Sequence, residues 1–195
     1  MYLHLWLAAQ KLIGGTYGKQ RLALSHYPGG SVLEIGCSVG NVSEAFAGRT
    51  NDFLGQDIDE RALQIANKRL DTLKFTSEPL EALNRKFDYV MIAGVLHHVD
   101  RATSLELVRQ AKRLAGPNAT IMSYDPLPVH PNASIPRKII GGMEAGRFLR
   151  PLNELVSLYE ESGIPVSDSY VYPLSAWKTA IPEIFDLGVV VAKQP

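Results

Sequence analysis

The residues of this 195-residue chain that could do chemistry stand at the ends of short apolar runs. Glu34 lies in the first run, which leads into a turn of small residues, Gly36-Cys37-Ser38-Val39-Gly40. Small residues let a backbone approach a ligand closely, and amides at the start of a following helix favour an anionic group. Asp57 follows Glu34 by 23 residues, close to the spacing of an acid that accepts hydrogen bonds from ribose hydroxyls. The pattern predicts a nucleoside-type ligand.

Two adjacent histidines, His97 and His98, follow another apolar run, residues 87–93. Histidine is the usual general base near neutral pH, so either one is a candidate to take a proton from a substrate. A histidine in this position can also serve only in packing or in hydrogen bonds to the backbone. Tyr124 and Asp125, which end a later run, could face the same substrate.

Short apolar runs alternate with helical patterns along the whole chain, which is typical of βαβ units and a parallel sheet. Strands are expected at residues 31–35, 53–57, 73–77, 87–93, 119–124, 168–171 and 187–192. Helices are expected at residues 2–13, 18–27, 42–47, 60–71, 101–115 and from Leu152 to Gly163, with Asp59 as the N-cap of the 60–71 helix. The last two strands could form an antiparallel pair at one edge.

The length suits one domain spanning residues 1–195. Within it, residues 1–30 are expected to form a helical lid. Residues 126–150, rich in proline, glycine and basic side chains, are expected to form an excursion over one edge, on the side of the substrate.

The glycine-rich turn admits more than one interpretation. A dinucleotide site needs a small residue where this chain has Asn41, so that match is poor. Residues 36–40 also spell Gly-x-Ser-x-Gly, the turn of a serine hydrolase, with Ser38 as nucleophile and Asp88 and a histidine following. However, only 30 residues precede the first strand, too few for the strands that such a hydrolase builds before its nucleophile.

A third interpretation rests on several motifs in series. The segment Val32-Leu33-Glu34-Ile35-Gly36-Cys37-Ser38-Val39-Gly40 resembles the first motif of class I methyltransferases, with Ser38 in place of the usual central glycine. Residues 53–59 resemble the second motif, and residues 87–98 resemble the Phe-Asp-x-Val to Leu-His-His stretch of many small-molecule methyltransferases. The resemblance covers about residues 31–192.

This resemblance implies a Rossmann-like three-layer α/β sandwich, whose mostly parallel seven-stranded sheet has an antiparallel edge strand. It implies S-adenosylmethionine as cofactor, S-adenosylhomocysteine as product, and methyl transfer to an oxygen or nitrogen of a small-molecule acceptor. His97 and His98 are the candidate bases. The implied cofactor-binding residues are Glu34, Gly36, Cys37, Ser38, Gly40, Asp57, Ile58, Ser77, Glu78, Ala93 and Gly94. A protein that binds the cofactor without catalysis is the main alternative.

The composition narrows the partners. Lysine plus arginine equals aspartate plus glutamate, at 20 each, whereas a nucleic-acid binder usually carries a basic excess. No run of 18 apolar residues is present, so no membrane span is expected. Cys37 is the only cysteine, which indicates a reducing compartment such as the cytoplasm. No metal-ligand spacing is evident, and so no metal is expected.

Overall fold

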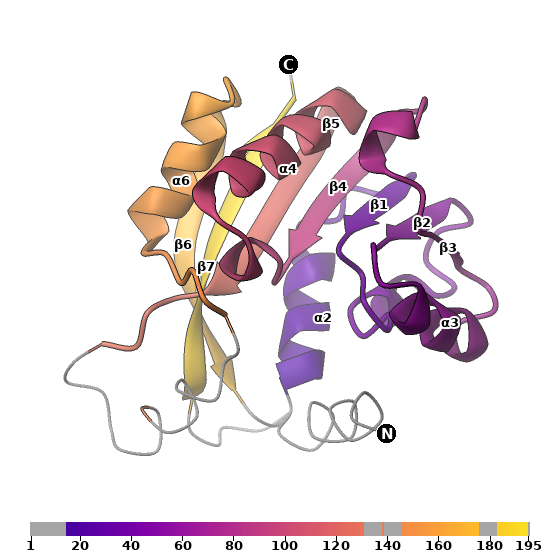
Figure 1. Ribbon diagram of the computed structural model, residues 1–195, viewed down its shortest axis with the longest axis horizontal. Helices are drawn as coiled ribbons and strands as arrows, with labels where there is room; N and C mark the ends of the chain where they lie inside the picture. Colours follow the sequence, from indigo (N-terminus) through magenta and orange to yellow (C-terminus); the bar gives the residue numbers. More distant parts are fainter. Residues whose placement is uncertain (1–14, 131–137, 139–145, 176–182, 195) are drawn as a thin grey trace.

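The computed structural model describes residues 15–130, 138, 146–175 and 183–194. Its centre is one seven-stranded sheet in the order β3-β2-β1-β4-β5-β7-β6 (Figure 1). The strands are β1 (Val32–Ile35), β2 (Phe53–Gln56), β3 (Lys74–Thr76), β4 (Phe87–Ala93), β5 (Ala115–Pro126), β6 (Val166–Ser175) and β7 (Glu183–Lys193). Strands β1 to β5 pair in parallel, while β7 runs antiparallel to both β5 and β6. The predicted mostly parallel sheet with an antiparallel pair at one edge is confirmed.

Helices cover both faces of the sheet and complete three layers. They are α2 (Gly15–Ser25), α3 (Glu60–Arg69), α4 (Arg101–Leu114) and α6 (Leu152–Glu161), with 3-10 turns η1 (Ser43–Phe46), η2 (Leu80–Ala82) and η3 (Leu96–His98). Helices α4 and α6 lie side by side on one face, and α2 packs on the other (Figure 1). Within the described residues, no helix is both long enough and apolar enough to cross a membrane.

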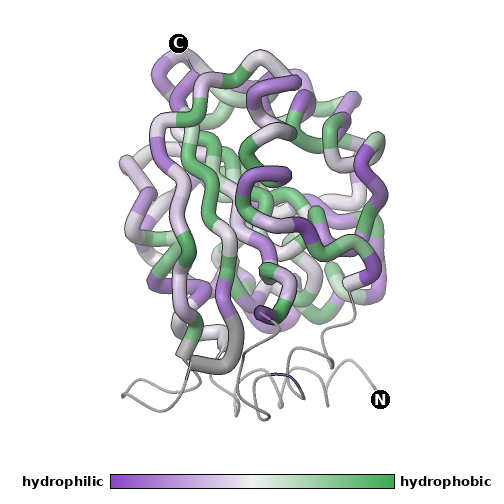
Figure 2. Tube along the Cα trace, turned by 90° about the vertical axis from the view of Figure 1, so that its left-hand side faces the viewer, coloured by the Kyte–Doolittle hydropathy of each residue, from purple (hydrophilic) through white to green (hydrophobic). Residues whose placement is uncertain are grey.

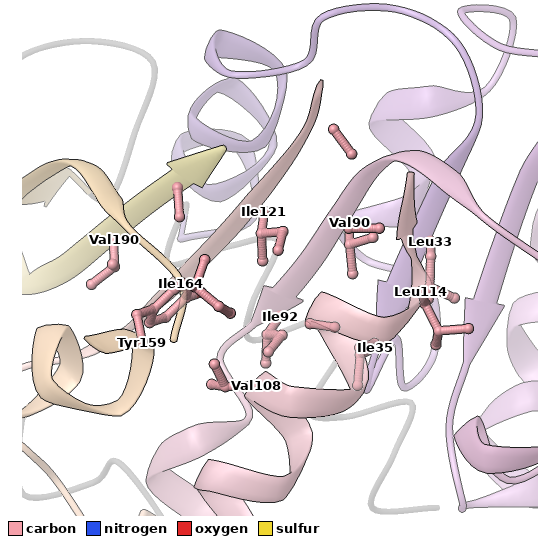
Figure 3. Close-up of a cluster of buried hydrophobic side chains, with 14 of the residues drawn as sticks. Leu33, Ile35, Val90, Ile92, Val108, Leu114, Ile121, Tyr159, Ile164 and Val190 are labelled. Atoms are coloured by element: carbon pink, nitrogen blue, oxygen red, sulfur yellow. The ribbon is translucent and has the colours of Figure 1, made fainter. Parts of the chain in front are cut away.

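The alternation of side chains along the strands builds two cores. In β1, Leu33 and Ile35 join the core beneath α4 and α6, whereas Val32 joins the core beneath α2. Figure 3 shows the first core, in which Val108 of α4 and Tyr159 of α6 point toward the sheet. Hydrophobic residues run along the interior strands in Figure 2, as expected for a sheet buried on both faces.

Local capping explains where the helices begin and end. The Asp59 side chain accepts hydrogen bonds from the amides of Arg61 and Ala62 and starts α3, as predicted. Asp100 does the same for α4 through the amide of Thr103. Gly163 takes a left-handed conformation just after α6, which is the usual way to end a helix.

The structure corrects several boundaries. Helix α2 begins and ends earlier than the predicted 18–27 helix, and β6 and β7 are longer than the predicted 168–171 and 187–192 strands. The predicted 42–47 helix is only the 3-10 turn η1, because Gly48 turns into a left-handed conformation directly after it. The fifth strand is longer than predicted because its continuation, Asp125 and Pro126, pairs with β7. The predicted 2–13 helix lies outside the described residues, as does most of the 126–150 excursion. The lid assigned to residues 1–30 stays a prediction.

We expect Ile92→Ala to destabilise the protein by about 2–5 kcal/mol, because it leaves a cavity in the fully buried centre of β4. Urea unfolding followed by circular dichroism measures the change in the free energy of unfolding. Val171→Ala is the matched control: this side chain on β6 is 48% exposed, and its loss should cost no more than about 0.5 kcal/mol. Equal effects of the two variants would contradict the described core.

Candidate functional site

A cavity of about 530 Å³ opens at the carboxyl ends of β1, β2 and β4. Its volume lies within the range of roughly 300–1,000 Å³ that is usual for small-molecule sites. Carboxyl ends of parallel strands, next to the point where the strand order reverses, are where open α/β sheets bind ligands. The predicted site residues that line the cavity are Glu34, Gly36, Cys37, Ser38, Asp57, Ile58, Ala93, Gly94, His97 and His98.

The glycine-rich turn is held against the end of β2. The amides of Gly36 and Cys37 both donate to the carbonyl oxygen of Gln56, at 2.7 and 3.0 Å. Gly36 has φ of +73°, and a Cβ there would stand 2.3 Å from a methyl of Val95. Only glycine therefore fits, because the turn approaches the loop after β4 too closely for a side chain.

Ser38 stands where the family motif usually has glycine, and it adopts the conformation that glycine favours, with φ of +49°. Its amide donates to Oδ2 of Asp57 at 2.7 Å, which helps to hold this turn. Burial raises the pKa of the neighbouring Cys37 thiol far above its usual range. Cys37 is therefore an inert wall residue of the cavity rather than a nucleophile.

Asp57 projects from the end of β2 with both carboxylate oxygens in use. Besides Ser38, it accepts a hydrogen bond from the amide of Asp59, Oδ1 to N, at 2.9 Å. These two bonds fix the carboxylate at the cavity wall, where its remaining lone pairs can accept from two hydroxyls. Ile58, next in the chain, is 89% exposed and lines the cavity, which is unusual for so large an apolar side chain.

Three residues named from the motifs do not line the cavity. Gly40 has φ of +78°, and a Cβ there would stand 2.8 Å from Leu70, so it serves the packing of the turn. Ser77 and Glu78 follow β3 and are exposed. The carbonyl oxygen of Glu78 accepts a hydrogen bond from Nε2 of Gln56 at 3.2 Å. Their assignment to the cofactor stays a prediction.

Glu34 is an unusual wall residue because it is a buried carboxyl, only 1% exposed. Oε2 accepts a hydrogen bond from the Ser43 hydroxyl at 2.5 Å, and no basic side chain in the described part of the chain forms an ion pair with it. Burial, opposed by the Ser43 bond and reinforced by the charge of Asp57, raises the pKa of Glu34 to about 8. In the absence of ligand, Glu34 is therefore mostly protonated at pH 7.

His97 forms a buried pair with Asp125, which comes from the end of β5. Nδ1 of His97 lies 2.6 Å from Oδ1 of Asp125, and the backbone amide of His97 donates to the same oxygen at 3.0 Å. Both side chains are at most 4% exposed. His98 is exposed, and its ring centroid lies 3.9 Å from that of His97. The carboxylate thus fixes the orientation of His97 at the cavity wall.

The segment after the excursion encloses the histidine turn. The buried guanidinium of Arg150 donates to the carbonyl oxygens of Leu96 and Val99, at 2.6 and 2.9 Å. The backbone amide of Phe148 donates to the carbonyl oxygen of His97 at 3.0 Å. A Cβ on Gly146 would stand 2.3 Å from Cδ2 of His97. The position of His97 is thus set by both β5 and residues 146–150.

Sequence reasoning missed several cavity residues. Thr16 and Lys19 line the cavity from α2, and Thr103 and Leu107 line it from α4. Their positions in the sequence carry no motif, because helices that pack over a sheet meet the cavity only through the fold.

The hydrolase interpretation fails on geometry. His97 pairs with Asp125 rather than Asp88, which lies at the other end of β4 and accepts hydrogen bonds from Ser31. No hydrogen bond joins Ser38 to a described histidine. Within the described residues, no group of three or more His, Cys, Asp or Glu side chains is placed to hold a metal ion.

Comparisons with known proteins agree with this geometry. Residues 33–121 match the family model of the methyltransferase domain. No curated protein matches the chain in sequence. Among solved structures, magnesium protoporphyrin IX methyltransferase of Synechocystis PCC 6803, with S-adenosylhomocysteine bound, is 18% identical, with a TM-score of 0.67 over 92% of this chain and 84% of that one.

Two further structures are N-methyltransferases with the same product bound. NodS of Bradyrhizobium japonicum WM9 is 15% identical, with a TM-score of 0.67 over 92% of this chain and 85% of that one. The glycopeptide N-methyltransferase MtfA is 16% identical, with a TM-score of 0.71 over 93% and 90% of the two chains. At these identities the likeness concerns the fold.

The fold has the Rossmann-like architecture of these solved methyltransferases, and residues 33–121 match the methyltransferase domain. The motif series predicts S-adenosylmethionine as the cofactor of such a domain.

The residues present fit this cofactor. Asp57 offers carboxylate lone pairs for ribose hydroxyls, and the exposed Ile58 offers an apolar surface for the adenine ring. Glycine at position 36 leaves the backbone open beside the ends of β1 and β4, where Ala93 and Gly94 present their backbone.

The pKa of Glu34 predicts how stability depends on pH. The folded state raises this pKa from 4.5 to about 8, so its stabilising effect is complete below pH 4.5 and is lost as the pH rises toward 8. We expect the ligand-free protein to lose up to about 1.4 kcal/mol per pH unit in this window from this group. Urea unfolding of the wild type and of Glu34→Gln measures it. A parallel slope in both proteins would contradict the assignment.

Asp57→Ala should weaken the binding of S-adenosylhomocysteine by about 1–3 kcal/mol, because buried charged hydrogen bonds to the ribose are lost. Isothermal titration calorimetry measures the affinity. Asp88→Ala is the control: this carboxylate lies at the opposite end of β4, outside the cavity, and accepts hydrogen bonds from Ser31, so its loss should cost about 1 kcal/mol of stability but change affinity little. An unchanged affinity in Asp57→Ala would refute the ribose assignment.

Proposed function

We propose that this chain is an S-adenosylmethionine-dependent methyltransferase with S-adenosylhomocysteine as its product. It methylates an oxygen or nitrogen of a small organic acceptor, with His97 as general base oriented by Asp125. The buried pair of these two residues, in the wall of the cavity that also holds the ribose-type acid Asp57, is the observation that carries the proposal. A general base is useful when the acceptor is a hydroxyl or an ammonium, because its proton must leave as the methyl group arrives.

The carboxylate decides which nitrogen of His97 can act. With Nδ1 donating to Asp125, Nε2 has the lone pair that takes the acceptor proton. Asp125 also stabilises the imidazolium that forms. S-adenosylmethionine supplies an electrophilic methyl group when bound. The protein adds alignment of the acceptor with that methyl, which can provide much of the rate.

The similar solved structures and the balanced net charge of this chain both favour a small acceptor. The similar structures are named for a magnesium protoporphyrin IX, a glycopeptide and a Nod-type N-methyltransferase. The balanced charge of this chain gives no electrostatic reason for a nucleic-acid acceptor. The single, buried cysteine suits a reducing compartment, so we place the enzyme in the cytoplasm.

The test is transfer of labelled methyl from S-adenosylmethionine into separate fractions of a cell extract: small molecules, nucleic acid and protein. Label should enter the small-molecule fraction. His97→Ala and Asp125→Asn should slow this transfer by about 100-fold or more while S-adenosylhomocysteine affinity stays within a few fold.

The variants distinguish the readings of this site. Label in the nucleic-acid or protein fraction would overturn the small acceptor. No transfer by a protein that binds S-adenosylhomocysteine would favour the non-catalytic alternative. Full transfer by both variants would show that His97 has a structural role only.

A further inference from the structure

Two hydroxyl groups in the cavity wall have no hydrogen-bond partner. Thr16 and Tyr124 both line the cavity, and their side chains belong to residues only 8% and 1% exposed. Within the described part of the chain, neither Oγ1 of Thr16 nor the phenol oxygen of Tyr124 accepts or donates a hydrogen bond. Buried polar groups almost always have a hydrogen-bond partner, so two hydroxyls without one in the wall of a ligand cavity indicate that the ligand is their partner.

The two hydroxyls lie near the ends of β4 and β5. Tyr124 pairs with Ala93 in the sheet, and its carbonyl oxygen accepts a hydrogen bond from the amide of Gly94 at 2.8 Å. Thr16 is in the first turn of α2 and lines the same cavity as Ala93 and Gly94 at the end of β4. The Tyr89 hydroxyl donates to the Ala23 carbonyl at 2.9 Å and ties α2 to this face of the sheet.

The charges around these hydroxyls favour an anion. Lys19 follows Thr16 by three residues on α2, on the same helix face, and lines the same cavity. Glu34 is the acid whose charge acts most strongly on Tyr124. Because burial raises its pKa to about 8, it is mostly neutral at pH 7 and does not repel an anion. Asp125 is engaged by His97.

We infer that Thr16 and Tyr124, with Lys19 beside them, form a subsite for a carboxylate of the bound ligand. A carboxylate has enough lone pairs to accept from both hydroxyls at once, and charged acceptors form the stronger bonds. This assignment rests on the proposed function, and either of two ligands can supply the group: the amino-acid end of the cofactor or an acceptor that bears a carboxylate.

The first arm of the test compares S-adenosylhomocysteine with 5′-methylthioadenosine, which lacks the amino-acid end. If the cofactor supplies the carboxylate, Thr16→Val and Tyr124→Phe should each weaken S-adenosylhomocysteine by roughly 10- to 100-fold and leave 5′-methylthioadenosine within twofold. Calorimetry measures both affinities. Tyr159→Phe is the matched control, because this phenol is equally buried but lies in the core on the other face of the sheet.

The second arm uses benzoate as a carboxylate probe, with benzamide as its neutral counterpart, followed by saturation-transfer NMR with and without S-adenosylhomocysteine. If the acceptor supplies the carboxylate, both variants should leave S-adenosylhomocysteine affinity unchanged but abolish the preference for benzoate over benzamide.

The subsite is overturned if the variants change neither the affinity for S-adenosylhomocysteine nor the preference for benzoate over benzamide. It is also overturned if they weaken the binding of S-adenosylhomocysteine and 5′-methylthioadenosine equally. A wild type that binds neither nucleoside refutes the proposed function instead. The benzoate preference then still decides whether the subsite exists.

Discussion

The carbonyl oxygen of Gln56, at the end of β2, accepts hydrogen bonds from two successive amides, those of Gly36 and Cys37. This shared acceptor folds the chain sharply at the end of β1 and places the small-residue turn beside the loop after β4. The left-handed conformation of Gly36 and its closeness to Val95 follow from it. The next amide, from Ser38, then donates to the Asp57 carboxylate, so the acid predicted to bind the ribose is positioned by the same turn. Without that bend, the carboxyl ends of the three strands would share no cavity.

The site reduces the cost of burying its ionisable side chains in three different ways. Glu34 escapes the cost of a buried charge by staying protonated. Asp125 has a histidine partner that changes protonation state during the proposed reaction. Arg150 remains a cation, but it is surrounded by the carbonyl oxygens of Leu96, Phe148 and Val99 rather than by a carboxylate. A guanidinium with its fixed fork of donors suits this task, because it closes a turn that has several unpaired carbonyls.

Sequence reasoning identified the parts of the site that are local in the chain. The strand-turn pattern around Glu34, the acid at Asp57 and the histidines after β4 each sit in one short motif, and parallel pairing brings the motifs together. The link between His97 and Asp125 could not be assigned, because 28 residues separate them and only the β4–β5 register makes them neighbours. Thr16 and Lys19 carried no signal at all, since helix α2 meets the cavity only through tertiary packing. The prediction of a helix at residues 42–47 was wrong, because a hydrophobic pattern of one turn does not distinguish a 3-10 turn from a longer helix.

The site thus combines residues from short sequence motifs with residues that only tertiary packing brings to the cavity, and these two groups differ in how freely they can be substituted. The Asp57 carboxylate accepts hydrogen bonds from the backbone amides of Ser38 and Asp59, so a substitution of Asp57 disturbs the geometry of the turn as well. The walls provided by helices α2 and α4 are held instead mainly by side-chain packing, with single contacts such as the bond from Tyr89 to Ala23. Their inward-facing side chains can change with less effect on the nucleoside end. In the proposed reaction, specificity for the acceptor would therefore depend on the elements that the motifs do not mark, which is why sequence motifs indicate the cofactor far more readily than the substrate.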